Sequence, residues 1–143
     1  MKTSRIIFGG LAGSVAFFFL GWMIYGIILH NFIQANYNNC AARPMEEMVW
    51  PALILSNLFM GYLIALAISK TGVKNTLQAI GMTAALGFLI SASMDFSVYS
   101  MNTVYLNAKA LTLDIVIGTL MYGFVGFVEA LIMLPGKKQK AQA

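Results

Sequence analysis

Four long apolar runs, separated by shorter polar segments, dominate the pattern of this chain. They cover residues 6–29, 50–69, 77–99 and 110–134. Each is long enough to cross a bilayer as a helix, which needs roughly 20 mostly apolar residues. The pattern therefore predicts an all-α fold, an integral membrane four-helix bundle, in which residues 1–143 form a single four-span transmembrane domain.

Composition strengthens this prediction. Of the 143 residues, 59% are hydrophobic and only 10% are charged, whereas soluble domains usually carry about 25% charged residues. The net charge is +4, but the basic residues do not alternate with aromatic ones as they do in proteins that bind nucleic acid. We therefore expect the lipid bilayer, and no nucleic acid, as the main partner.

The basic residues also predict an orientation. Cytoplasmic segments of membrane proteins are enriched in lysine and arginine. One side of the predicted bundle would hold seven of them and the other side only two: Lys2, Arg5, Lys70, Lys74, Lys137, Lys138 and Lys140 against Arg43 and Lys109. We expect both termini to be cytoplasmic and the two longer loops to be external.

The fourth run carries polar groups on one face. On a helix, its polar and aromatic positions share a stripe with Asp114 and Glu129 at the two ends, and a second stripe of small residues lies beside it. The first stripe contains Asp114, Gly118, Tyr122, Val125 and Glu129, and the second Thr119, Gly123, Gly126 and Ala130. Both stripes predict contacts with other helices, because charged groups at membrane depth normally face protein or water.

Two of the spans show a weak internal similarity. NLFMGY in the second run (57–62) resembles TLMYGF in the fourth (119–124), and the first and third runs, both rich in glycine, would point in the same direction. A duplicated two-helix unit would produce this pattern, as in transporters with repeated halves. Chance similarity between apolar segments is the alternative.

Depth in the membrane groups four polar residues near the external side. Asp95 and Asp114 would lie about 7 Å beneath the interface, given a rise of 1.5 Å per helical residue. Asn57 of the second run and His30 at the end of the first reach the same level. We call these four residues the external polar cluster and take them as a candidate ligand or proton site.

Two interpretations of the external polar cluster stay open. Two carboxylates in one pocket would need a shared proton or a bound cation, because burial and a like-charged neighbour both oppose ionisation. Alternatively the two aspartates are structural. They would then reach lipid headgroups, Lys109 or Arg43, or hydrogen-bond to Asn57 and His30.

Glu129 and Tyr122 form a second candidate site. Glu129 lies more than about 20 Å along the helix from Asp114, near the cytoplasmic end. A structural ion pair with Arg5, Lys70 or Lys74 is one expectation for it, and a second gate of a transport pathway is the other. Tyr122 would constrict a pore lined by this stripe or would be a core aromatic.

No motif predicts an enzyme, a metal site or a cofactor. His30 has no partner at HxxH or HExxH spacing, and no GxSxG nucleophile element is present. The single cysteine, Cys40, excludes an internal disulfide and a CxxC motif. We expect a non-catalytic protein without cofactors.

Three segments resemble a known group of proteins. They are FLGWMIYGIILHNF at the end of the first run, RPMEEM before the second and MDFSVY in the third. They are similar to a group of small uncharacterised bacterial inner-membrane proteins with four predicted helices, a domain of unknown function. The motifs of that group, a Gly-Trp-x-x-Tyr-Gly element and an aspartate before an aromatic, are matched here by Gly21, Trp22, Tyr25, Gly26, Asp95 and Phe96. The resemblance implies the architecture and a location in the bacterial inner membrane, and no activity.

Two function hypotheses follow. The first is binding or translocation of a small solute, proton or cation through the external polar cluster. The alternative is a structural or accessory subunit of a larger membrane complex. Because one copy has little interior for a pathway, we also expect a homo-oligomer or a membrane partner protein, with the stripes of small residues as interfaces.

Overall fold

The computed structural model describes residues 2–38, 40, 43 and 45–134, and it is built from helices. Four of the described helices are long and apolar enough to cross a membrane, which confirms the predicted all-α class and the four spans. In chain order the elements are α1 (Thr3–Met23), the π-helical turn η1 (Ile24–Ile28), α2 (His30–Asn36), the 3-10 turn η3 (Met45–Glu47), α3 (Trp50–Lys70), α4 (Thr76–Met101) and α5 (Ala108–Met133).

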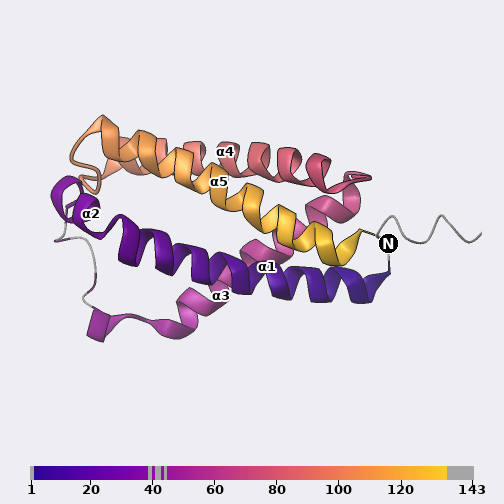
Figure 1. The fold of residues 1–143 in the computed structure, drawn as a ribbon. Helices are drawn as coiled ribbons and strands as arrows, with labels where there is room; N and C mark the ends of the chain where they lie inside the picture. Colours follow the sequence, from indigo (N-terminus) through magenta and orange to yellow (C-terminus); the bar gives the residue numbers. More distant parts are fainter. Residues whose placement is uncertain (1, 39, 41–42, 44, 135–143) are drawn as a thin grey trace, which may run out of the picture.

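Successive long helices run in opposite directions (Figure 1). The start of α1 and the end of α5 lie together at one end of the bundle, which we call the terminal end, and there the Arg5 side chain donates a hydrogen bond to the Met133 carbonyl oxygen at 3.4 Å. The connections 29–49 and 102–107 lie at the opposite end, which we call the loop end.

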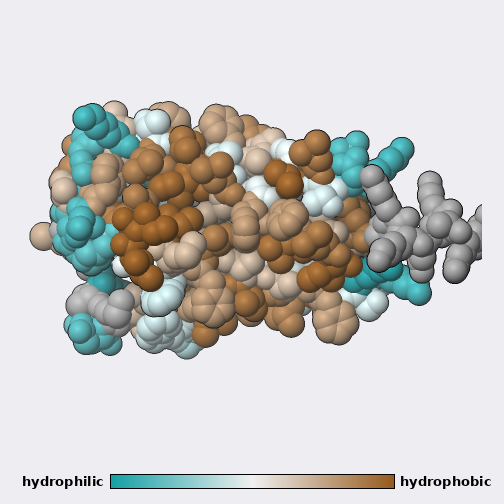
Figure 2. All heavy atoms as spheres, viewed as in Figure 1, coloured by the Kyte–Doolittle hydropathy of each residue, from teal (hydrophilic) through white to brown (hydrophobic). Residues whose placement is uncertain are grey.

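The surface has the polarity expected of a membrane-spanning bundle. Figure 2 shows hydrophobic side chains over the middle of the molecule and hydrophilic ones gathered at its two ends. Many large apolar side chains are accordingly exposed on all four long helices, among them Phe8, Phe59, Leu89 and Leu120. In a bilayer these side chains would face lipid.

Helix α5 is the most buried of the four spans, and glycines set its distance from α4. The side chain of Tyr122 fills the space above Gly87, and Thr83 lies against Gly126. Between lipid-solvated helices there is little hydrophobic driving force, so close approach at small residues and the dispersion contacts it allows hold them together. The two stripes predicted on this helix therefore do contact other helices.

Helices α1 and α3 form a second close pair. Gly61 of α3 lies against the backbone of Gly10 and Ser14 of α1, and the Ser14 hydroxyl donates to the Gly10 carbonyl oxygen at 2.7 Å. Ala65, one helical turn after Gly61, is fully buried, so α1 and α3 each present a stripe of small residues to the other. These stripes are thus used inside one copy of the chain.

The connection after the first span is more helical than the sequence pattern indicates. Residues 30–49 read as a loop, but α2 occupies its first part. Phe32 of this helix packs on the apolar cluster around Tyr105, and Asn36 donates to the Phe32 carbonyl oxygen at 2.9 Å. Tertiary packing of this kind stabilises helices that are too short to persist alone. A short 3-10 turn, η3, follows before the second span.

The close approach at Gly61 predicts a stability difference between two glycine variants. A methyl group added at Gly61 would lie 2.5 Å from the Gly10 carbonyl oxygen, whereas one added at Gly81 would meet no atom within 4 Å. Overpacking against backbone costs about 1–3 kcal/mol, and alanine is favoured over glycine within a helix by up to about 1 kcal/mol. Gly61→Ala should therefore lower the free energy of unfolding in mild detergent and Gly81→Ala should not. Equal destabilisation of both variants would contradict this packing.

Candidate functional site

One tyrosine hydroxyl joins the two aspartates near the loop end. The Tyr105 hydroxyl lies 3.0 Å from Oδ1 of Asp95 in α4 and 2.6 Å from Oδ2 of Asp114 in α5. The two carboxylate oxygens are therefore no further apart than the sum of these distances. Both aspartates are partly buried, and Tyr105 is 8% exposed.

A second tyrosine reaches Asp114 from the first span. The Tyr25 hydroxyl donates to Oδ1 of Asp114. Tyr25 lies on η1, where the Leu29 amide bonds to the Ile24 carbonyl oxygen five residues earlier. A π-helical turn of this kind inside a helix is frequently found at functional sites.

The two connections at the loop end are tied to each other above the aspartates. Their hydrogen bonds run from the Asn38 amide to the Val104 carbonyl oxygen (2.8 Å), from the Leu106 amide to the Asn36 carbonyl oxygen (3.0 Å), and from the Asn107 side chain to the Asn36 side chain (2.8 Å). The rings of Tyr37 and Tyr105 pack edge to face with centroids 5.1 Å apart. We name Asp95, Asp114, Tyr25, Tyr37 and Tyr105 the aspartate–tyrosine cluster.

The aspartate–tyrosine cluster has more short contacts between oxygens at Tyr105 than hydrogens to fill them. Tyr105 has a single hydroxyl hydrogen, yet its oxygen lies within hydrogen-bond distance of two carboxylate oxygens. If Tyr105 donates to Asp114, the shorter contact, then a proton on the Asp95 carboxyl or a cation nearby would complete the contact with Asp95. The arrangement is suited to holding one positive charge.

The tyrosines outside the spans are held in their protonated form. Burial raises the pKa of Tyr105 well above its ordinary value of 10.0, and the hydrogen bond to Asp114 and the charges of both aspartates raise it further. Burial and the charges of Asp114 and Asp95 also raise the pKa of Tyr37. These hydroxyls therefore remain hydrogen-bond donors to the carboxylates at any ordinary pH.

The structure brings together only two members of the external polar cluster. His30 is exposed, and no hydrogen bond joins it to either aspartate in the part of the chain that the structure describes. The Asn57 side chain donates to the Leu53 carbonyl oxygen of its own helix at 2.7 Å. The grouping of all four residues was wrong because α3 packs mainly against α1, so Asn57 faces α1 and not α4.

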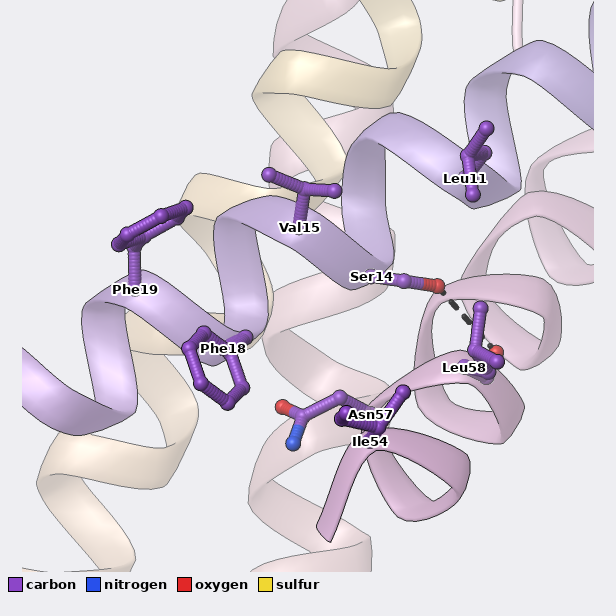
Figure 3. Close-up of a pocket in the computed structure, with 8 residues that line it drawn as sticks. All are labelled: Leu11, Ser14, Val15, Phe18, Phe19, Ile54, Asn57 and Leu58. Atoms are coloured by element: carbon purple, nitrogen blue, oxygen red, sulfur yellow. Dashed lines mark hydrogen bonds between the residues drawn. The ribbon is translucent and has the colours of Figure 1, made fainter. Parts of the chain in front are cut away.

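Asn57 instead lines an apolar groove of about 340 Å³ between α1 and α3. Figure 3 shows its amide beside Phe18, with the Ser14 hydroxyl bonded to the Leu58 carbonyl oxygen nearby. Apart from Ser14 and Asn57, the residues that line the groove are apolar: Leu11, Val15, Phe18, Phe19, Ile54 and Leu58.

The structural alternative for the two aspartates named protein partners other than those observed, and its contact with lipid headgroups stays a prediction. It invoked Lys109, Arg43, Asn57 and His30, but the hydrogen bonds that the described residues make to the aspartates come from tyrosine hydroxyls. Depth reasoning applied to tyrosines as well as to charged and amide residues would have found Tyr25, which lies five residues before His30. Tyr37 and Tyr105 reach the cluster through loop pairing, which the sequence pattern does not predict.

The second candidate site is buried. Tyr122 is 3% exposed, its ring packs on Phe17 with centroids 5.1 Å apart, and its hydroxyl contacts the Met60 sulfur at 3.0 Å, so it is a core aromatic. Glu129 is completely buried and neither carboxyl oxygen has a hydrogen-bond partner among the described residues. Within the part of the chain that the structure describes, the expected ion pair is not formed: Arg5 bonds to the Met133 carbonyl oxygen, and Lys70 and Lys74 are exposed.

Comparison with family models, with curated proteins and with solved structures finds no match. The resemblance to four-helix bacterial membrane proteins therefore stays a prediction. Within the described residues, no group of three or more histidine, cysteine, aspartate or glutamate side chains converges as a metal site would require. The aspartate–tyrosine cluster is the arrangement from which a function can be argued.

The raised pKa of Tyr105 predicts a stability change at alkaline pH. Unfolded Tyr105 would ionise near pH 10, whereas the folded state keeps the proton, so the unfolded state loses protons first and the free energy of unfolding falls as pH rises above about 10. In Tyr105→Phe this fall should be shallower by up to about 1.4 kcal/mol per pH unit. Denaturant unfolding at a series of pH values measures it.

Tyr99→Phe is the matched control, because Tyr99 is exposed on α4 outside the cluster. Its pH profile should follow the unmodified protein. A profile for Tyr105→Phe that also follows the unmodified protein would show that Tyr105 is not held by the aspartates.

Proposed function

We propose that the aspartate–tyrosine cluster binds one proton or one small cation, and that this non-catalytic protein binds or moves that charge, or a small solute coupled to it, across a membrane. The observation that carries the proposal is the Tyr105 hydroxyl, which lies within hydrogen-bond distance of both Asp95 and Asp114 while supplying only one hydrogen. Among the described residues the aspartates are contacted by tyrosine hydroxyls and by no lysine or arginine, which supports a compensating charge that comes from outside the protein.

A single charge suits this set of ligands better than a divalent ion does. The oxygens available are those of two carboxylates and of tyrosine hydroxyls that already donate to them. Calcium takes about six to eight oxygen ligands and magnesium about six. With two carboxylates already joined through Tyr105, a proton or a monovalent cation is the simpler occupant.

The proposal includes an orientation and a location. With the loop end external and the terminal end cytoplasmic, the side richer in lysine and arginine faces the cytoplasm, as is usual, and the aspartate–tyrosine cluster faces outward. The resemblance found in the sequence supports a bacterial inner membrane. A duplicated two-helix unit remains a separate hypothesis, which the function does not require.

Translocation would need a further opening of the bundle. Below Asp114 on the same stripe of α5, Tyr122 fills the space between α5 and α4 at Gly87. A charge bound at the loop end therefore meets packed side chains on its way to the terminal end. Separation of helices, or a second copy of the chain, would have to provide the path.

One observation favours the alternative function, an accessory subunit of a larger complex. The groove between α1 and α3 opens on the membrane face of the bundle and contains the amide of Asn57. Polar side chains in membrane helices often hydrogen-bond to a neighbouring helix. Because the small-residue stripes of α1 and α3 are already used within the chain, an oligomer or a partner protein would have to contact another surface such as this one.

Neutralising the aspartates should abolish charge movement. In reconstituted vesicles, Asp95→Asn and Asp114→Asn should reduce proton or cation flux to the level of protein-free vesicles, because the amides cannot balance a bound charge. Glu47→Gln is the control, since Glu47 is exposed on η3, and it should keep the flux of the unmodified protein. Flux that persists in both aspartate variants would refute the proposal.

The alternative predicts a different result in solubilised membranes. An accessory subunit should co-purify with a second membrane protein in mild detergent, and Asn57→Leu should weaken that association while leaving the aspartate–tyrosine cluster unaltered. Purification of the chain alone as a monodisperse species, together with flux in vesicles, would exclude the accessory role.

A further inference from the structure

Glu129 carries an ionisable carboxyl group that has no polar partner in the described part of the structure. Its side chain is 0% exposed, and both carboxyl oxygens lack a hydrogen bond among the described residues. It lies on α5 about 22 Å along the helix from Asp114, in the half of the bundle towards the terminal end. The described residues therefore lack the ion pair that a buried carboxylate normally forms.

The carboxyl is enclosed at the contact between α1 and α5. It occupies the space that a side chain at Gly13 would need, so it lies directly against the backbone of α1. Val125, Ala130 and Met133, its neighbours along α5, are fully or almost fully buried and apolar. The glycine is what allows a carboxyl group to fit between two helices here.

The titratable groups on the surrounding helices do not pair with the Glu129 carboxyl. Arg5 of α1 bonds to the Met133 carbonyl oxygen, Tyr62 of α3 packs against Gly10, and Lys70 at the end of α3 is exposed. On α4, the residue that faces this part of α5 is Thr83, which bonds to its own helix at Ala79. On α5 itself, Tyr122 contacts Met60.

An ionised carboxylate in these surroundings would be far more costly than a neutral carboxyl. Burying a charge without a counter-charge or hydrogen bonds is among the largest penalties in protein structure, and such a group stays neutral instead. A carboxyl that is neutral in the closed contact and ionised when water reaches it takes up and releases one proton. The position, and not only the residue type, gives Glu129 this property.

We propose that Glu129 is a proton-binding site that is loaded while α1 and α5 touch at Gly13 and that exchanges its proton with the terminal side when the two helices separate. The core is packed on both sides of Glu129, and the exchange is directed to the terminal end because the path there is shorter: α5 ends at Met133, only one helical turn beyond Glu129. Towards the terminal end, Met133 lies against Gly9 about one helical turn away, and the polar contact of Arg5 follows. This site is independent of the aspartate–tyrosine cluster.

Infrared spectroscopy of the full chain in phosphatidylcholine vesicles tests the site. At neutral pH the unmodified protein should show the carbonyl stretch of a protonated carboxyl that accepts no hydrogen bond, and Glu129→Gln should lack it. Should the glutamine variant fail to fold, Glu129→Met provides an apolar side chain of similar length for the same comparison. Asp95→Asn and Asp114→Asn should keep the band, which separates this site from the proposed function.

A pair of glycine variants tests the role of the helix contact. In Gly13→Ala the added methyl group would overlap the Glu129 carboxyl and move it towards water, so the band at neutral pH should shrink by half or more. In the control, Gly81→Ala on α4, the methyl group would meet no atom within 4 Å, and the band should keep its size.

Three results would overturn the inference. Absence of the band in the unmodified protein would mean that Glu129 is ionised and compensated by another charge. Persistence of the band in Glu129→Gln would assign it to a different carboxyl. Equal bands in Gly13→Ala and Gly81→Ala would show that the contact with α1 does not control the proton.

Discussion

Close approach of helices at glycine is the constraint on which this bundle depends. Helices in lipid gain little by hiding apolar side chains from their surroundings, so they associate through dense packing and through the few polar contacts that they share. Gly87 and Gly126 let α4 and α5 interlock, and Gly10, Gly13 and Gly61 do the same for α1 with its two neighbours. α5 lies among the other spans because its own neighbours present small residues to it.

The polar chemistry of the protein follows from this packing. The stripe of α5 that carries Asp114 and Glu129 faces the other spans, so Asp114 is partly buried and Glu129 completely buried. The Asp114 carboxylate is stabilised by hydrogen bonds from Tyr25 of the first span and Tyr105 of a loop. The described residues offer Glu129 no hydrogen bond, only space beside Gly13. One helix thus carries a well-partnered acid near one membrane surface and an unpartnered acid towards the other.

The sequence pattern predicted those features of the structure that depend on helical periodicity. The spans, their small-residue faces and the neighbourhood of Asp95 and Asp114 follow from helical periodicity and from the short connection between the third and fourth spans. Asn57 was misplaced because periodicity does not say which helix a given face meets. The roles of Tyr37 and Tyr105 were missed because they depend on hydrogen bonds between two loops that are more than 60 residues apart in sequence. The helix α2 was missed for a similar reason, since its stability comes from contacts of Phe32 and not from its own composition.

The hydrogen bonds that tie residues 36–38 to residues 103–107 have a mechanical consequence. They fasten the hairpin of α4 and α5 to the connection that follows α1, whereas at the opposite end the described residues link α1 to α5 through the hydrogen bond of 3.4 Å from Arg5 to the Met133 carbonyl oxygen. Any tilt of α1 relative to α5 therefore has its pivot at the fastened end. Displacement grows with distance from a pivot, so the same rotation that barely moves Tyr25 moves the residues around Gly9 the most. Asp114 therefore lies at the end of the bundle where such a tilt moves α1 least, and Glu129 lies under the part of α1 that it moves more.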